Sequence, residues 1–149
     1  MKVGIGSDHQ GFRLKSVLSD FLRMRGVSVV DFGTYSKESC DYPDYVYSLG
    51  KAIREKSVDR GIFICYTGIG SCIVANKIKG IRAGVVWNVA TAVLSRKHNN
   101  TNVLVFGAKG LKRESAKKIV WRWLHTEFEG GRHLRRLRKV KSIEEAESV

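Results

Sequence analysis

One thiol, Cys65, stands where a buried-strand pattern gives way to a glycine-containing turn. The stretch from Gly61 to Ser71 reads G-I-F-I-C-Y-T-G-I-G-S, with apolar residues before the thiol and two further glycines after it. Gly68 and Gly70 allow the backbone to approach a ligand closely, and the helix expected after them offers free N–H groups to an anion. The turn lacks the third glycine of the dinucleotide fingerprint and the G-K-[ST] of nucleotide loops. Alone, the stretch indicates either a reactive thiol beside an anion site or an inert core cysteine.

Other groups that could handle protons lie next to predicted strands. Asp8 and His9 follow the first strand, and His98 and Asn99 precede the fifth. Ligands of open parallel sheets bind beyond the carboxyl ends of the strands. We therefore expect these residues to gather with Cys65 at one rim of a sheet. Each histidine could equally be a polar residue at a helix end.

Apolar periodicity defines the elements that must position these residues. Short apolar runs predict strands, and repeats at i, i+3 and i+4 predict helices. The strands are expected at 3–7, 27–32, 61–65, 81–87 and 102–107. The helices are expected at about 10–25, from Pro43 onward, at about 69–77, from the end of the fourth strand to about 97, and at 111 to about 128. This alternation predicts an α/β three-layer sandwich with a Rossmann-like, five-stranded, mainly parallel sheet. We expect residues 1–149 to form one domain, with a basic segment from about 130 to 149.

The chain is strongly basic, with 27 Lys and Arg against 14 Asp and Glu and a net charge of +13. The run G-R-H-L-R-R-L-R-K-V-K, residues 131–141, holds six of the basic residues and no acidic one. Such an excess is typical of a nucleic-acid partner or of an anionic small substrate, and a basic run can also be a solvated tail. Arg132 and Arg136 are four residues apart and would share one face of a helix, which suits a phosphate clamp.

Composition argues against several other classes. The start of the chain has a short apolar segment that is too small for a signal peptide, and no run approaches the roughly 20 apolar residues of a membrane span. The three cysteines are an odd, unpatterned set, which predicts reduced thiols in the cytoplasm. We see no cluster of His, Cys and carboxylate residues at metal-ligand spacing in the sequence, which favours a metal-independent protein.

Six motifs, in order and over nearly the whole chain, resemble type B ribose-5-phosphate isomerases. They are D-H-Q-G-F-x-L-K (8–15), D-Y-P-D-Y (41–45), I-C-x-T-G-I-G (64–70), A-N-K-x-x-G-I-R-A (75–83), S-R-x-H-N-x-T-N-V-L (95–104) and E-G-G-R-H-x-x-R (129–136). The superfamily also holds galactose-6-phosphate and allose-6-phosphate isomerases. The resemblance implies that ribose 5-phosphate and ribulose 5-phosphate interconvert through an enediolate, in the non-oxidative pentose phosphate pathway.

The resemblance also implies a role for each residue of the site. It makes Cys65 the base, and a thiol at a helix N-terminus near basic groups is suited to that task. Thr67 and the N–H groups of Gly68, Ile69 and Gly70 would stabilise the charge on the sugar oxygens. His98 would open the sugar ring and Asn99 would orient the substrate. The remaining substrate-binding residues would be Asp8 for the hydroxyls, Tyr42 as a wall, and His9, Arg132 and Arg136 for the phosphate, together with Lys109 and with Ser71 in the loop.

The implied assembly is a homodimer, or a tetramer built from it, whose active site takes residues from both chains. The resemblance implies no metal, no cofactor, no nucleic acid and no membrane as partner. A hexose-6-phosphate isomerase of the same superfamily is the first alternative. A basic nucleic-acid-binding domain is the second, although the sequence contains no reader motif for it.

Three residues depart from the family pattern. Tyr66 stands where glycine is common, Cys72 where serine is common, and Lys109 where arginine is frequent. A lysine keeps the positive charge but loses the two-pronged hydrogen bonding of a guanidinium. These changes leave the reaction type intact and predict a narrower or reshaped substrate pocket.

Overall fold

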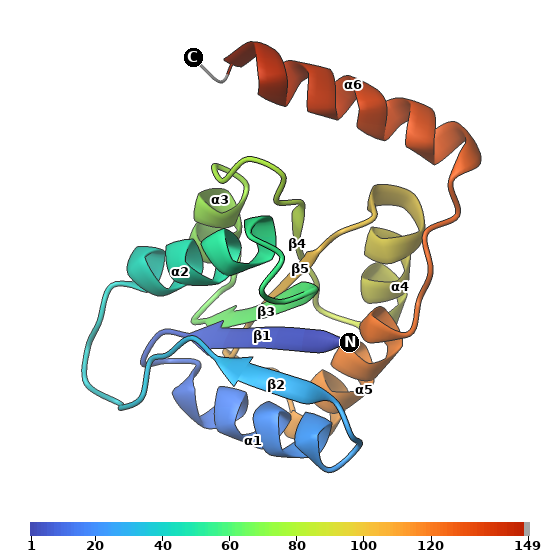
Figure 1. Ribbon diagram of the computed structural model, residues 1–149. Helices are drawn as coiled ribbons and strands as arrows, with labels where there is room; N and C mark the ends of the chain where they lie inside the picture. The colour runs from blue at the N-terminus through green and yellow to red at the C-terminus, as the bar shows by residue number, and fades with distance from the viewer. Residues whose placement is uncertain (148–149) are drawn as a thin grey trace.

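The computed structural model describes residues 1–147, which contain one parallel sheet with helices on both faces (Figure 1). The strands are β1 (Lys2–Ser7), β2 (Ser28–Asp31), β3 (Arg60–Cys65), β4 (Ala83–Val85) and β5 (Val103–Gly107). They lie in the order β2-β1-β3-β5-β4, and all four pairings are parallel. The predicted α/β sandwich with a mainly parallel, five-stranded sheet is confirmed.

Two helical layers follow from the direction in which each connection moves across the sheet. The helices are α1 (Phe12–Arg23), α2 (Tyr42–Arg54), α3 (Ile69–Ala75), α4 (Val89–Asn99), α5 (Arg113–Leu124) and α6 (Gly131–Glu147). The connections through α2 and α3 move one way across the sheet, and those through α1 and α4 move the other way. Crossovers of one hand that run in opposite directions place their helices on opposite faces.

Side chains alternate across the sheet and fill a separate core on each face. In β3, Ile62 and Ile64 face the layer of α1 and α5, where Trp123 and Leu18 are buried. Phe63 and Cys65 face the layer of α2 and α3 and pack with residues such as Leu49. Cys65 is therefore positioned by the pleat of a central strand that is covered on both faces.

Some element boundaries differ from those expected from the sequence. The strand expected at 81–87 is shorter, Ala83–Val85, because β4 lies at the sheet edge and β5 is the strand with which it pairs. The helix expected to run to about 128 ends at Leu124. The chain turns there because two hydrogen bonds hold it against α4. The buried Arg96 Nε donates to the Thr126 carbonyl at 3.2 Å, and the Glu129 N–H donates to the Lys97 carbonyl at 3.1 Å. Beyond this turn the basic segment is helical, as α6.

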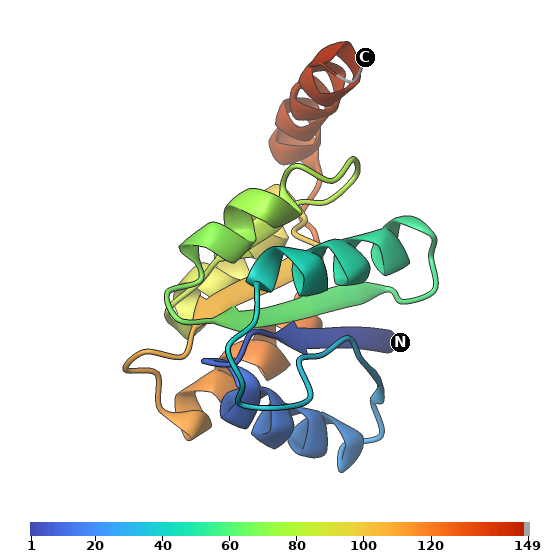
Figure 2. The ribbon, with the colours of Figure 1, turned by 90° about the vertical axis from the view of Figure 1, so that its left-hand side faces the viewer.

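Helix α6 projects away from the sandwich instead of covering a face of the sheet (Figures 1 and 2). It touches the rest of the chain next to α4 and at Gly80, whose N–H donates to Glu144 at 2.7 Å. Its side toward the body contributes Leu137, Val140 and Ile143 to a groove of about 880 Å³. Within residues 1–147, no helix combines the length and the apolar character needed to cross a lipid bilayer.

Candidate active site

Two central strands end side by side where the strand order reverses. Ser7 of β1 pairs with Ile64 of β3, and the Asp8 N–H donates to the Ile64 carbonyl at 3.2 Å. Connections from β1 and β3 leave in opposite directions, so Asp8 and Cys65 occupy the topological switch point of the sheet. In open α/β sheets this crevice is the usual ligand site. The arrowheads of β1 and β2 in Figure 1 point to this carboxyl edge.

The Cys65 thiol lies directly beneath the glycine turn. The side chain is 5% exposed, and its Sγ accepts a hydrogen bond from the Gly68 N–H at 3.1 Å. Gly68 has a φ of +87°, a conformation that glycine adopts without strain and that turns its N–H back toward the sulfur. The predicted thiol beside a turn of amide groups is thus present in the fold.

The turn has a polar lip and an aromatic wall. Thr67 is exposed, and its Oγ1 accepts from the Ile69 N–H at 3.3 Å. The Tyr42 hydroxyl packs so closely on Gly70 that a Cβ there would collide with it. Ser71 is fully buried, and its hydroxyl has no hydrogen-bond partner among the described residues. The part given to Ser71 in substrate binding stays a prediction.

Asp8 and His9 are fixed by backbone groups. The Asp8 carboxylate is buried and accepts from the Gln10 and Gly11 N–H groups at 2.9 and 3.0 Å. His9 Nδ1 accepts from the Cys40 N–H at 3.2 Å. In a neutral imidazole this bond leaves the proton on Nε2, which can donate to a ligand oxygen.

Tyr66 and Lys109 form a pair beside the thiol. Tyr66 is 47% exposed, and the Lys109 Nζ lies 5.2 Å from the centre of its ring. The Lys109 N–H also donates to the Tyr66 carbonyl at 3.2 Å. An ammonium over an aromatic face is attracted to it, so the ring restricts where Lys109 can reach. Two departures from the family pattern are thus in contact with each other.

His98 and Asn99 do not join Cys65, and the expectation that they share its rim was wrong for a single chain. They end α4, whose C-terminus leads into the amino end of β5. Cys65 pairs instead with Gly107, at the carboxyl end of that strand. The four residue steps from Val103 to Gly107 put the two edges about 13 Å apart. A residue that precedes a parallel strand lies at the opposite edge from one that follows it.

At the amino edge, His98 belongs to a second polar cluster with Glu129 and His133. The two imidazole rings stack with centroids 4.1 Å apart and an angle of 10° between planes. Glu129 Oε2 lies 4.0 Å from His98 Nε2 and 3.6 Å from His133 Nε2. Burial lowers the pKa of His133, and the positive charges of His98 and Arg132 act in the same direction.

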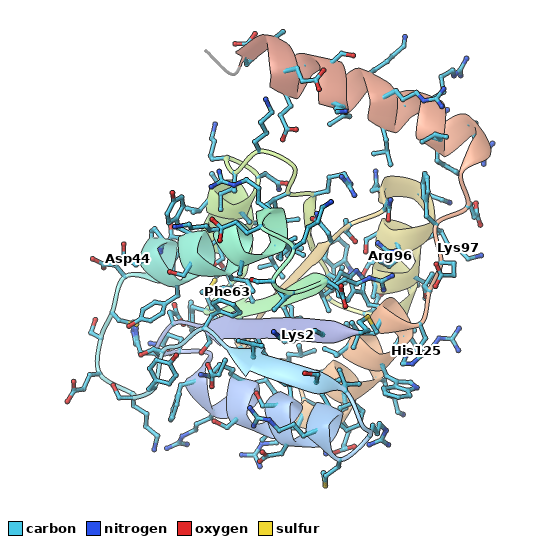
Figure 3. All side chains as sticks on the ribbon, in the orientation of Figure 1. Lys2, Asp44, Phe63, Arg96, Lys97 and His125 are labelled. Atoms are coloured by element: carbon cyan, nitrogen blue, oxygen red, sulfur yellow. The ribbon has the colours of Figure 1, made fainter. Side chains whose placement is uncertain are left out.

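The end of α4 is held by its neighbours on two sides. Arg96 is buried on the sheet side of the helix and donates to the Thr101 carbonyl at 2.6 Å. Lys97 lies on the side of the α5–α6 connection, with its Nζ 3.1 Å from Glu129 Oε1 (Figure 3). Arg132 and Arg136 lie one turn apart on α6 and are exposed. They accompany His98 at the amino edge, away from Cys65.

Sequence reasoning missed three contributions to this arrangement. Glu129 and His133 stood in a recognised motif, but only the fold of α6 onto α4 brings them to His98. The sequence argument against a cluster of metal-ligand type is therefore corrected by the structure. Lys15 is buried and bonds both Asp31 and the Thr34 carbonyl, which ties the loop after β2 to α1. Nothing in the sequence around Lys15 indicates that it is buried or that it pairs with Asp31.

Comparisons with known proteins agree with this geometry. The family model described as Ribose/Galactose Isomerase matches residues 3–140. The chain is similar to the ribose-5-phosphate isomerase B of Escherichia coli, with 47% identity over 97% of each chain. It is similar to a solved structure of the Clostridium thermocellum ribose-5-phosphate isomerase B, with a TM-score of 0.98, 48% identity and coverage of 99% and 100%. The Mycoplasma genitalium enzyme solved with bound ribulose-5-phosphate matches with a TM-score of 0.93, 40% identity and coverage of 97% and 96%.

Proposed function

The chain belongs to the ribose/galactose isomerase family, and we propose that it interconverts D-ribose 5-phosphate and D-ribulose 5-phosphate. It is a sugar-phosphate aldose-ketose isomerase. The observation that carries the chemistry is the Cys65 thiol, held by the Gly68 N–H at 3.1 Å beside Asp8 at the switch point. That the enzyme acts in the pentose phosphate pathway and in the cytoplasm stays a prediction.

The reaction moves one proton between two neighbouring carbons. The Cys65 thiolate removes the proton from C2 of the open-chain aldose, and the electron pair shifts to give an enediolate with its negative charge on the C1 oxygen. The same thiol returns the proton to C1 and becomes a thiolate again, while the proton of the C2 hydroxyl passes to the C1 oxygen as the ketone forms. The Thr67 hydroxyl and the amide groups at the start of α3 stabilise the oxygen charge, since the first amides of a helix lack partners within it.

Ring opening and phosphate binding need groups that a single chain keeps far from Cys65. The substrate in solution is mostly a closed ring, and His98 is suited to moving the proton that opens it. Asn99, Arg132 and Arg136 lie near it at the amino edge, and the packed sheet separates this edge from Cys65. His9 and Lys109 lie at the Cys65 edge, where they complete the phosphate site from the other side.

We propose that a second copy of the chain supplies the missing half. A two-fold dimer can bring the Cys65 edge of one protomer against the His98 edge of its partner, and the same contact then forms twice. The projection of α6 from the body supports this arrangement (Figure 2). The groove beneath α6 supports it as well, because Leu137, Val140 and Ile143 line it and remain open in a single chain. Ile69, Ile73 and Trp87 are also exposed apolar residues. Whether two such dimers form a tetramer stays a prediction.

A panel of sugar phosphates tests the substrate and the rival assignment to hexose phosphates. We expect the highest kcat/KM for ribose 5-phosphate, with allose 6-phosphate and galactose 6-phosphate poorer by about 10- to 200-fold, the usual effect of one extra carbon unit in a pocket. The Tyr66 ring beside Cys65 takes up room that a longer sugar needs. Tyr66→Gly should therefore reduce the discrimination.

The matched control is Tyr66→Phe, which keeps the ring and its contact with Lys109 and should keep the discrimination. A wild-type preference for a six-carbon phosphate would replace ribose 5-phosphate as the substrate. An unchanged substrate ratio in Tyr66→Gly would remove Tyr66 from the account of selectivity.

A further inference from the structure

We propose that His98, Glu129 and His133 form a binding site for a transition-metal cation of the Zn²⁺ class, and that the bound metal inhibits the enzyme by occupying His98. Among residues 1–147, these three side chains each offer one donor atom, and the donor atoms lie within 4.8 Å of one another. Two imidazoles and one carboxylate are a ligand set that zinc uses in proteins, with a further position open to water. The binding claim stands on this cluster alone, whereas the inhibition rests on the proposed role of His98.

The donor spacing is close to that of a formed site. Glu129 Oε2 is 4.0 Å from His98 Nε2 and 3.6 Å from His133 Nε2. Ligand distances of about 2.0 to 2.2 Å in a tetrahedral site put donors roughly 3.4 Å apart. The first separation would have to shrink by roughly 0.6 Å and the second by roughly 0.2 Å, and no two of the three donor atoms lie more than 4.8 Å apart.

His133 supplies an independent sign that the cluster is set for a ligand. The residue is 7% exposed, and its buried Nε2 has no hydrogen-bond partner among the described residues. Glu129 Oε2 lies 3.6 Å from this nitrogen, which is beyond hydrogen-bond distance. Buried polar atoms are normally paired, so a nitrogen left over beside a carboxylate and a second imidazole points to an absent ligand.

The carboxylate is held in place from behind. Lys97 Nζ lies 3.1 Å from Glu129 Oε1, and the Glu129 N–H donates to the Lys97 carbonyl at 3.1 Å. These contacts leave the other carboxylate oxygen, Glu129 Oε2, facing the two imidazoles. Outer partners of this kind orient the ligands in metal sites and raise their affinity.

Two features of the cluster select the kind of metal. The imidazole rings are stacked, so their lone pairs must turn to converge, and His98 is exposed enough to make that turn. The neighbouring Arg132, Arg136 and Lys97 repel any cation. A metal that bonds strongly to imidazole nitrogen can bind despite this charge, whereas Mg²⁺ and Ca²⁺, which prefer oxygen ligands, should not.

Calorimetric titration of the intact, reduced protein with Zn²⁺ tests the site. We expect one metal per chain, and at least about tenfold weaker binding in Glu129→Gln and in His133→Asn, since each loses a donor. His125→Asn is the matched control, because His125 is an exposed imidazole next to Trp121 and outside the cluster. Glu129 is itself a surface side chain, so its variant tests the site even if the buried His133 is needed for folding.

Cobalt distinguishes this site from the cysteines. Co²⁺ bound to imidazole and carboxylate gives visible d–d bands without a thiolate charge-transfer band, and we expect this spectrum. A thiolate band, or Zn²⁺ affinity unchanged in Glu129→Gln and His133→Asn, would overturn the site. Zinc should also inhibit isomerisation, and a chelator should restore the activity. The same zinc concentration should inhibit Glu129→Gln less than the wild type. Metal binding at the cluster without inhibition would overturn the role given to His98 and leave the metal site standing.

Discussion

Replacing Cys65 with serine should lower kcat for ribose 5-phosphate by about 10³-fold, within the range that a positioned general base contributes. An alcohol ionises far less readily than a thiol, so serine offers almost no anionic base, and only the proton transfer depends on that base. KM should change little, because serine keeps the size of the side chain and the Gly68 N–H can still donate to it. A coupled assay of ribulose 5-phosphate formation measures both constants. Iodoacetamide should inactivate the wild type, and substrate should protect it.

Cys72→Ser is the matched control for this prediction. Cys72 is half-buried on α3, its thiol donates to the Ala83 carbonyl at 3.5 Å, and burial raises its pKa. A thiol that is bonded in this way and remains protonated cannot act as the base, so Cys72→Ser should keep nearly the full rate. Near-normal turnover by Cys65→Ser would show that Cys65 is not the base.

The double variant Arg132→Ala/Arg136→Ala should raise KM by on the order of 100-fold, since each hydrogen bond from a charged group contributes about 1.5 to 3 kcal/mol. Both guanidinium groups lie one turn apart on α6 and are exposed. kcat should fall less, because neither residue handles the proton. Inorganic phosphate should inhibit the wild type competitively and the double variant more weakly.

Arg138→Ala/Lys141→Ala is the control for the arginine pair. Lys141 lies 3.5 Å from Glu145 in an exposed i,i+4 pair of the kind that contributes little. Changing these outlying charges should leave KM nearly unchanged. Tight RNA binding that depends on Arg132 and Arg136, with KM unchanged in the double variant, would instead favour the nucleic-acid alternative for the basic segment.

The sequence predicted those parts of the site that depend on local pattern. The apolar run to Cys65 and the glycines at 68 and 70 were sufficient to place a thiol at a strand end beside a turn of amides. Asp8 was expected at the same edge, and its hydrogen bond to Ile64 places it there. These inferences succeed because strand pleat and turn geometry are set by near neighbours in the chain.

The parts that could not be predicted depend on distant contacts. The stacking of His133 on His98 requires the chain to leave α5 at Leu124 and return along α4 through Arg96 and Lys97. The sequence indicated only that Arg132 and Arg136 would share one face if the basic tail were helical. The separation of His98 from Cys65 could have been seen from strand direction, since α4 leads into the amino end of β5.

The pairing of a Cys65 edge with a partner's His98 edge is tested most directly by complementation between two inactive chains. Cys65→Ser and His98→Asn chains, each with a different affinity tag, are co-expressed and the mixed dimer is purified. In that dimer one site carries both substitutions, and the other joins an intact Cys65 to an intact His98. We predict that each parent dimer is nearly inactive and that the mixed dimer has about half the wild-type rate, as two-fold symmetry requires. A mixed dimer as inactive as its parents, or a fully active monomer, would contradict the shared site.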